Sequence, residues 1–316
     1  MCLALDAITN HAHLFAHYFK EHRCPATLAI IGIIVILRIF CGLLYILWTL
    51  IRPEKNLLMR YGKGYAVITG SSDGIGKKFA EELAQRGFNL VLIARNQQKL
   101  LEVKNSIIKL YPSIDVQIIV FDFGKTGKGD DYEPIKKFLE KLDIAILVNN
   151  VGMIYFHRFH EISDANLEEV INIDELSYIY MAKIVVPLML KRQGKSSIMM
   201  VSSGLSHSIC TNTSSYAIAK SAVNSLCKSL ALEYSEKIDI CCFDIGEVTT
   251  KANPKNNARH ITTEACVRAC LSKVGYEEMS AGHWKHRMIK AMGPYLTRSM
   301  SRKMGEQALK ASSKSD

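Results

Sequence analysis

Short apolar runs alternate with longer stretches of helical periodicity along most of the chain. The runs are continuous, rich in Val and Ile, and cover residues 65–69, 90–94, 116–121, 144–148, 197–201 and 238–243. Such runs are typical of strands that are buried on both faces of a sheet. Strands that alternate with helices, among them one helix expected over 165–191, predict βαβ units. We therefore predict an α/β fold, a doubly wound parallel sheet with helices on both faces.

A longer apolar segment precedes this pattern. Residues 26–51 carry one charge, Arg38, and a membrane-spanning helix needs about 20 apolar residues. A central arginine costs about 2.5–3.5 kcal/mol on insertion scales, which the surrounding Leu, Ile and Phe residues offset. We predict a membrane helix, with an interfacial or re-entrant helix, or a helix packed on the domain, as alternatives. Four basic residues within 52–63, against two within 20–25, place the rest of the chain in the cytosol.

The charge and cysteine content narrow the classes of partner. A net charge of +10 over 316 residues favours anionic membranes or phosphorylated ligands, although a solvated basic surface explains it equally well. Nucleic acid is not expected, because no aromatic platform or zinc-finger spacing accompanies the charge. Nine cysteines without a CxxC pair indicate a reduced protein. No metal site is predicted, because Cys266, Cys270, His283 and His286 lack a metal-binding pattern.

A glycine-rich turn joins the first predicted strand to the first helix. The stretch TGSSDGIG (69–76) places Gly70, Gly74 and Gly76 where a backbone can approach a pyrophosphate at a helix N-terminus. This pattern predicts a Rossmann-type dinucleotide site. Arg95, rather than an acid, follows the second strand and favours the 2′-phosphate of NADP(H). Arg95 as a surface charge is the alternative.

Four motifs in order carry a family resemblance. TGSSDGIG, NNVG (149–152), Ser203 and YAIAK (216–220) together resemble the short-chain dehydrogenase/reductase family over about residues 65–250. FAEELA, ILVNNVG, SSG and the N-terminal apolar segment resemble more narrowly its membrane-bound branch. That branch contains 17β-hydroxysteroid dehydrogenases, very-long-chain 3-oxoacyl-CoA reductases and hydroxysteroid dehydrogenase-like proteins. Some of the last group lack the catalytic tyrosine, which this chain retains as Tyr216.

The resemblance implies a role for each member of the Ser–Tyr–Lys set. Tyr216 would protonate the carbonyl oxygen of the substrate, and Ser203 would orient that carbonyl. A tyrosine has a pKa near 10, and the nearby Lys220 cation favours the phenolate and lowers that pKa toward the working range. Lys220 would also hold the nicotinamide ribose. The implied NADP(H)-binding residues are Thr69, Gly70, Ser72, Gly74, Ile75, Gly76, Arg95, Asp122, Asn149, Gly152, Tyr216, Lys220 and Thr250.

One residue departs from the family pattern. The family places a catalytic asparagine at the fourth position of the segment INIDEL (171–176), where this chain has Asp174. If only the backbone carbonyl at this position matters, aspartate can serve. If the carboxylate reaches Lys220, an ion pair would divert the lysine charge from Tyr216 and weaken catalysis.

Together these features predict a membrane-anchored, NADPH-dependent carbonyl reductase that acts on a 3-oxoacyl-CoA or a 17-ketosteroid. A catalytically impaired NADP-binding scaffold or regulatory protein of the same fold is the alternative. The predicted location is the endoplasmic reticulum membrane with a cytosolic catalytic domain, with the mitochondrion as alternative, and the resemblance implies a homodimer.

The predicted organisation has five parts: a polar segment (1–25), a membrane anchor (26–51), a basic linker (52–63), a reductase domain (64–283) and a basic tail (284–316). The tail is expected either to lie on a membrane as an amphipathic helix or to pack on the domain as a basic solvated helix.

Overall fold

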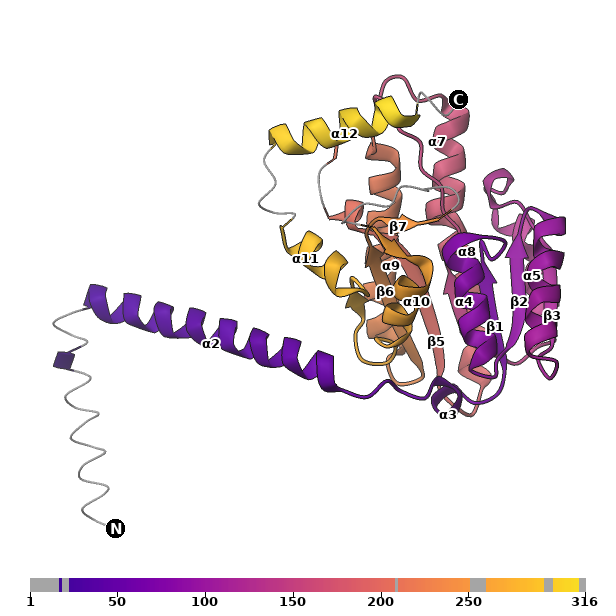
Figure 1. The fold of residues 1–316 in the computed structure, drawn as a ribbon, viewed down its shortest axis with the longest axis horizontal. Coiled ribbons are helices and arrows are strands. Elements are labelled where there is room, and N and C mark those ends of the chain that lie inside the picture. The colour runs from indigo at the N-terminus through magenta and orange to yellow at the C-terminus, as the bar shows by residue number, and fades with distance from the viewer. Residues whose placement is uncertain (1–16, 19–22, 208–209, 251–259, 293–297, 313–316) are drawn as a thin grey trace, which may run out of the picture. The chain divides into compact units, whose positions relative to one another are not determined.

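Seven parallel strands form one sheet in the computed structural model, which describes residues 17–18, 23–207, 210–250, 260–292 and 298–312. This arrangement confirms the predicted doubly wound parallel sheet (Figure 1). A separate parallel pair consists of β7 (Val248–Thr249) and β8 (Ile261–Thr262). The order in the main sheet is β3 (Val116–Val120), β2 (Asn89–Ala94), β1 (Tyr65–Thr69), β4 (Ile144–Asn149), β5 (Ser196–Ser203), β6 (Ile238–Ile245) and β9 (Met279–Ser280).

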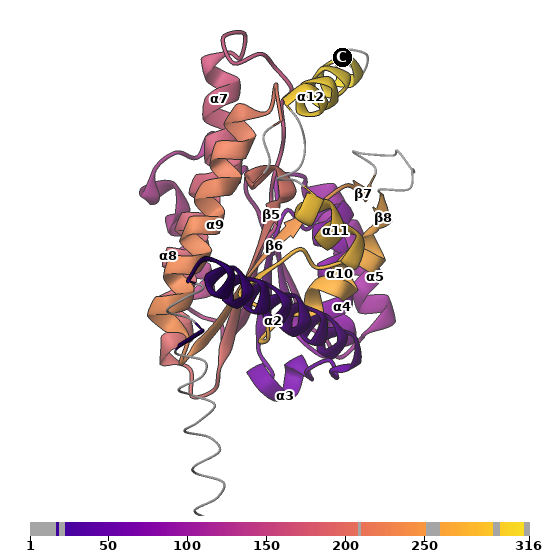
Figure 2. The same ribbon diagram turned by 90° about the vertical axis from the view of Figure 1, so that its left-hand side faces the viewer.

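Helices cover both faces of the sheet, as Figure 2 shows. Neighbouring strand residues therefore enter different cores: Ala66 and Ile68 belong to one apolar cluster and Val67 to the other. This two-sided burial explains why the strands are continuously apolar. One face carries α4 (Gly74–Gln85), α5 (Gln97–Leu110) and α10 (Thr263–Leu271); the other carries α6 (Glu133–Leu139), α8 (Ser177–Lys191) and α9 (Ser214–Tyr234).

The helix expected over 165–191 is interrupted. It consists of α7 (Asp164–Ile171), a π-helical turn η3 (Asn172–Leu176) and α8. A π turn inserts an extra residue into a helix and often marks a functional site. Here it contains Asp174, whose side chain is fully buried. Short 3₁₀ turns are η1 (Phe123–Lys125), η2 (Gly129–Tyr132) and η4 (Gly204–Ser206).

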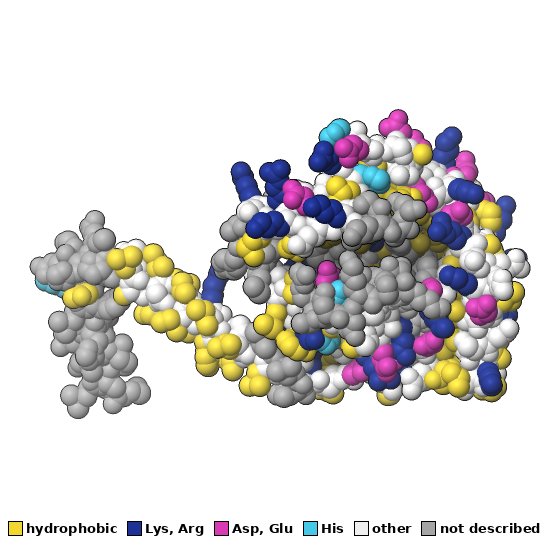
Figure 3. Space-filling model, turned by 45° about the horizontal axis from the view of Figure 1, so that its top comes forward, with side chains coloured by type: hydrophobic (Ala, Val, Ile, Leu, Met, Phe, Trp, Pro, Cys, Tyr) yellow, Lys and Arg dark blue, Asp and Glu magenta, His cyan; other side chains and the backbone are white. Residues whose placement is uncertain are grey.

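The chain divides into two units, residues 1–54 and 55–316. In the first unit, α2 (Arg23–Ile51) contains a stretch, Thr27–Thr49, with a mean hydropathy of 2.8 and no buried residues. Figure 3 shows the apolar side chains along this helix. By length and composition α2 is sufficient to cross a membrane.

The second unit begins at Lys55, and helix α3 (Leu57–Tyr61) lies within residues 52–63, the range predicted as a linker. The helix starts at the capping residue Asn56 and buries Leu57 and Tyr61 in the core. The Tyr61 hydroxyl donates to Asp239 Oδ2 of β6 at 2.7 Å. Residues 57–61 are thus part of the domain, because their apolar side chains complete its core.

Two helices, α11 (Trp284–Met292) and α12 (Arg298–Ser312), form the C-terminal part of the second unit. Helix α12 lies against the loop that leads into α9. Asn212 in that loop has a φ of +66° and donates from Nδ2 to the Gly305 carbonyl at 3.1 Å. A Cβ atom at Gly305 would lie 2.2 Å from Thr211 Oγ1, so only glycine permits this approach.

Replacing Gly305 by alanine should loosen α12, although alanine is favoured over glycine inside a helix by about 1 kcal/mol. The added methyl group would overlap both the side chain and the carbonyl of Thr211. We expect faster proteolysis within α12 and a lower melting temperature. Ser299→Ala, at an exposed position of the same helix, is the control and should change neither. Equal proteolysis of Gly305→Ala and the wild type would contradict this packing.

Candidate active site

The candidate site lies at the carboxyl ends of the strands. The strand order reverses between β1 and β4, and ligands of open α/β sheets bind at such a switch point. The glycine-rich turn after β1 meets the NNVG segment after β4 here. A Cβ atom at Gly70 would lie 2.9 Å from the Cα atom of Val151.

The glycine-rich turn forms a tight cradle at the N-terminus of α4. Gly70 and Gly74 have φ values of +66° and +56°, which favour glycine. A Cβ atom at Gly76 would lie 2.2 Å from the Gly70 carbonyl oxygen, so this position excludes a side chain. Asp73 caps α4 by accepting from the Gly74 amide at 2.8 Å. The cradle fits a dinucleotide pyrophosphate, which would lie on the free N–H groups of α4.

Asn150 joins the two halves of the switch point, and the sequence interpretation did not single it out. Its amide N–H donates to Thr69 Oγ1 at 2.9 Å, and its Nδ2 donates to the Thr69 carbonyl at 3.1 Å and to the Gly70 carbonyl at 3.3 Å. Its neighbour Asn149 donates from Nδ2 to the Tyr178 carbonyl at 3.2 Å. The second Asn of NNVG was the available signal.

Ser203 and Tyr216 come together from two elements. Ser203 ends β5, and Tyr216 lies in the first turn of α9. The two hydroxyl groups form a side-chain hydrogen bond, which is the arrangement expected of a carbonyl-binding serine and a proton-donating tyrosine. Lys220 lies one turn later in α9, with its Nζ 5.8 Å from the centre of the Tyr216 ring.

The Lys220 ammonium is fully buried and surrounded by acceptors. Its Nζ lies 3.0 Å from Asp174 Oδ1, 2.9 Å from the Tyr178 hydroxyl and 3.1 Å from the Val201 carbonyl oxygen. Two of its three N–H donors make hydrogen bonds, to Tyr178 and Val201, and Asp174 adds an ion pair rather than a third hydrogen bond. Lys220 could hold the ribose of a cofactor with its third N–H, in competition with the Asp174 carboxylate beside it. Tyr178 was missed in the sequence, where it carries no motif.

Asp174 is held in place by more than the lysine. Its Oδ2 accepts from the Met153 amide at 3.0 Å. A Cβ atom at Gly152 would lie 2.8 Å from Asp174 Oδ1, so Gly152 leaves room for the ion pair. Burial raises the pKa of the Asp174 carboxyl, and the Lys220 charge and the Met153 N–H oppose this effect. The structure thus places the carboxylate on Lys220, the second of the two arrangements considered from the sequence.

Tyr216 does not reach the pKa range expected from the sequence. Burial raises its pKa to about 12; Lys220 lowers it, while Asp174 raises it again and the Ser203 hydrogen bond lowers it. The lysine therefore offsets only part of the effect of burial. At neutral pH Tyr216 is protonated, which is the form required of a proton donor to a carbonyl oxygen.

The other predicted cofactor residues follow the same edge of the sheet. Arg95 is exposed after β2, 3.9 Å from Glu169 Oε1. Asp122 lies two residues after β3 and caps η1 by accepting from the Gly124 amide at 3.2 Å. Thr250 lies 3.4 Å from the Cβ position of Gly74 and so borders the glycine-rich turn. Ser72 lies in the turn itself, and Ile75 packs against the core.

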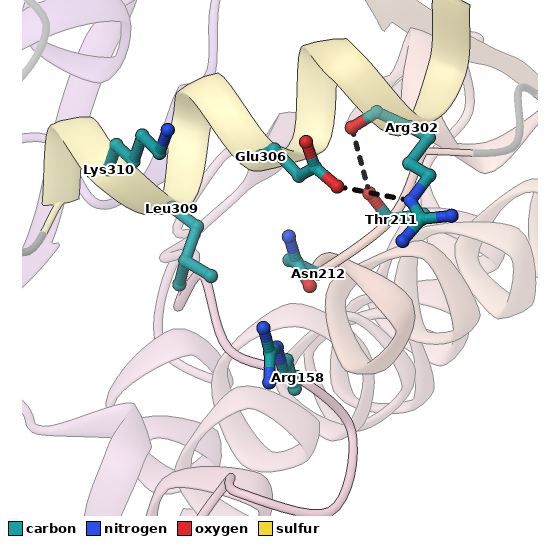
Figure 4. A pocket seen from close by; sticks show the side chains of 7 residues that line it. All are labelled: Arg158, Thr211, Asn212, Arg302, Glu306, Leu309 and Lys310. Carbon is teal, nitrogen blue, oxygen red and sulfur yellow. Dashed lines mark hydrogen bonds and ion pairs between the residues drawn. The ribbon is translucent and has the colours of Figure 1, made fainter. Parts of the chain in front are cut away.

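A cavity of about 520 Å³ lies between α12 and the segments that carry Arg158 and Thr211 (Figure 4), and none of Ser203, Tyr216 and Lys220 lines it. Arg302 is paired in it with Glu306 at 3.0 Å. Three cations and one acid, Glu306, line the cavity. Its lining residues are Arg158, Thr211, Asn212, Arg302, Glu306, Leu309 and Lys310.

Comparisons with known proteins agree with the four motifs. Residues 64–260 match the family described as short chain dehydrogenase. The chain is 36% identical over 258 residues to very-long-chain 3-oxoacyl-CoA reductase-B of Danio rerio, covering 77% of this chain and 81% of that protein. It is 32% identical over 242 residues to inactive hydroxysteroid dehydrogenase-like protein 1 of Homo sapiens, covering 74% of this chain and 72% of that protein. A solved short chain dehydrogenase from Shigella flexneri complexed with NADP shares the fold, with a TM-score of 0.63, 21% identity, and coverage of 72% of this chain and 98% of that chain.

Proposed function

Because the chain belongs to the short-chain dehydrogenase family, we propose that it is a membrane-anchored, NADPH-dependent carbonyl reductase. The observation that carries the proposal is the meeting of Ser203, Tyr216 and Lys220 beside the glycine cradle. The apolar helix α2 supports the anchor, and the endoplasmic reticulum with a cytosolic domain is the location we propose. A homodimer formed through α9 remains a prediction.

The chain's residues divide the reaction among themselves. Bound NADPH would supply the hydride that the carbonyl carbon takes up. Ser203 would donate a hydrogen bond to the carbonyl oxygen and fix its position. Tyr216 would transfer its phenolic proton to the same oxygen, so that the ketone becomes an alcohol. Lys220 would stabilise the phenolate that remains. The raised pKa of Tyr216 keeps this proton in place before the reaction, but it also makes the phenol a weaker acid toward the carbonyl oxygen.

The substrate class we propose is an apolar ketone. The relatives carry the names of 3-oxoacyl-CoA reductases and hydroxysteroid dehydrogenase-like proteins, and both classes of substrate partition into membranes. An anchor would hold the site near them. The net charge of +10 would attract the phosphates of an acyl-CoA.

A specific observation favours the alternative of an impaired, cofactor-binding protein. Lys220 donates hydrogen bonds to Tyr178 and Val201, and its charge is paired with the Asp174 carboxylate at 3.0 Å. A lysine paired in this way contributes less of its charge to Tyr216. One of the relatives, the human protein named above, also bears the word inactive in its name.

The test is turnover by the full chain in lipid nanodiscs. NADPH absorbance would be followed with a panel of 3-oxoacyl-CoA and 17-ketosteroid substrates. Loss of absorbance that depends on one class of substrate would establish the reductase and name that class. NADPH binding without turnover on the whole panel would contradict the reductase and support the impaired scaffold.

Arg95 should decide the cofactor. We expect Arg95→Glu to weaken NADPH binding by about 10- to 100-fold, because a charge-assisted hydrogen bond contributes about 1.5–3 kcal/mol, while NADH binding changes little. Dissociation constants for both cofactors would be measured by nucleotide fluorescence. Lys109→Glu, an exposed charge reversal at the end of α5, is the control. Equal weakening of both cofactors would mean that Arg95 does not meet the 2′-phosphate.

A further inference from the structure

Helix α11 displays apolar side chains to solvent. Trp284 and Met288 are 58% and 57% exposed and Ile289 is 40% exposed. Trp284 and Met288 are four residues apart and so share one face of the helix. His286 is buried: its ring would contact any Cβ atom at Gly246, and its Nε2 lies 3.3 Å from the Glu247 carbonyl oxygen. One face of α11 is thus fixed to the domain while an apolar face points away from it.

Two of the three Lys and Arg side chains of α11 are turned back toward the domain, and the third, Lys285, has its Nζ 6.0 Å from the centre of the Trp284 ring. Arg287 Nη2 lies 3.0 Å from Glu277 Oε2, and Lys290 Nζ lies 2.5 Å from Asp244 Oδ2. The helix has no acidic residue. These ion pairs keep the charges at the flanks of Trp284 and Met288. An apolar face with flanking cations and an aromatic residue is the pattern of a helix that lies in a membrane interface.

The covalent connection to α2 brings this region near a membrane. Helix α2 ends at Ile51, and the second unit begins at Lys55. Three intervening residues span at most about 14 Å. Lys55 bonds to the Gly275 carbonyl, and its Nζ lies 4.0 Å from the centre of the Tyr276 ring. Tyr276 comes eight residues before Trp284. The short tether formed by residues 52–54 therefore leads from α2 to Lys55, whose contacts, Gly275 and Tyr276, lie shortly before α11 in the sequence.

We propose that α11 is an interfacial helix that inserts Trp284, Met288 and Ile289 into the boundary of the bilayer that holds α2. The inference rests on the proposed anchor, which brings the bilayer within reach. A lipid surface is favoured over a second copy of the chain because the tether is short and because tryptophan prefers the membrane interface.

Insertion of α11 would place the substrate path at the membrane. Lys290 of α11 binds Asp244 of β6, and Asp244 pairs in register with Ser202, the residue before Ser203. The helix is therefore linked through one ion pair to the strand ends that carry the site.

The chain offers a direct test, because it contains two tryptophans, Trp48 in α2 and Trp284 in α11. In Trp48→Phe, the emission of Trp284 would be recorded in full-length protein reconstituted into vesicles of anionic and zwitterionic lipid. Part of the lipid would carry bromine either near the headgroup end or near the methyl end of its acyl chains. We expect a blue-shifted emission with stronger quenching by the shallow bromines, since interfacial helices lie about 5–10 Å into the boundary.

The complementary variant, Trp284→Phe, leaves Trp48 as a reporter of the anchor. Quenching of both tryptophans supports the interfacial helix and the anchor. Quenching of Trp48 alone overturns the interfacial helix and leaves the anchor standing. Quenching of Trp284 alone supports the interfacial helix but contradicts the anchor. Quenching of neither overturns both. A Trp284 emission that is blue-shifted without lipid quenching, and that shifts with protein concentration, would indicate a second copy of the chain and overturn the proposal.

Two charge insertions separate this face from general effects of surface charge. In the Trp48→Phe background, Met288→Glu should reduce the lipid quenching of Trp284, because it places a carboxylate beside anionic lipid. Leu232→Glu, at an 83% exposed position of α9, should leave the quenching unchanged. Equal quenching in Met288→Glu and its parent would overturn the proposal.

Discussion

Replacing Tyr216 by phenylalanine should reduce turnover by about 10²- to 10⁴-fold, the usual contribution of a positioned proton donor. The variant keeps the ring but loses the proton and the hydrogen bond to Ser203. NADPH binding should persist, because the glycine cradle is unchanged. NADPH oxidation and NADPH binding would be measured side by side. Tyr65→Phe, whose hydroxyl binds Asp115 away from the site, is the control and should keep full turnover.

The pH dependence gives the same residue a second readout. Since the pKa of Tyr216 is raised to about 12, the proton is present throughout the neutral range. Reduction should therefore be nearly constant from about pH 6 to 9, whereas alcohol oxidation, which needs the phenolate, should increase with pH over that range. Residual turnover in Tyr216→Phe with an unchanged pH profile would mean that another group supplies the proton.

Replacing Asp174 by asparagine should change activity and stability in opposite directions. Asp174 raises the pKa of Tyr216 and pairs with the Lys220 charge, so its neutralisation should lower that pKa and leave more of the lysine charge to Tyr216. A change of one pKa unit corresponds to about 1.4 kcal/mol, or about tenfold in rate. We expect turnover to rise by about that factor, measured as NADPH oxidation at saturating substrate.

The same substitution should cost stability. Lys220 would remain buried with only the neutral acceptors Tyr178 and Val201. We expect a loss of about 3 kcal/mol in the free energy of unfolding, the lower end for removal of one partner of a buried ion pair. Urea unfolding of Asp174→Asn, Lys220→Met and the double variant would measure the coupling. Additive losses together with unchanged turnover would mean that the ion pair has no influence on the site.

The sequence predicted most of the frame of the site but not its electrostatics. The buried strands could be recognised because both of their faces are apolar, and the glycine turn because Gly70, Gly74 and Gly76 permit conformations and contacts that other residues do not. The direction of the Asp174 side chain depends on the π turn, which inserts one residue without a sequence signal. The role of Tyr178 depends on which helix face meets Lys220 in three dimensions. The pKa of Tyr216 depends on burial, which outweighs its neighbouring charge.

The aspartate in the π turn also has a genetic consequence. Codons for aspartate and asparagine differ only in their first base, so a single transition exchanges the carboxylate for the amide. The glycine cradle, Ser203, Tyr216 and Lys220 would stay in place through that exchange. If the ion pair restrains the catalyst, the restrained and the released forms are therefore immediate mutational neighbours, and a lineage can move between them without rebuilding the site.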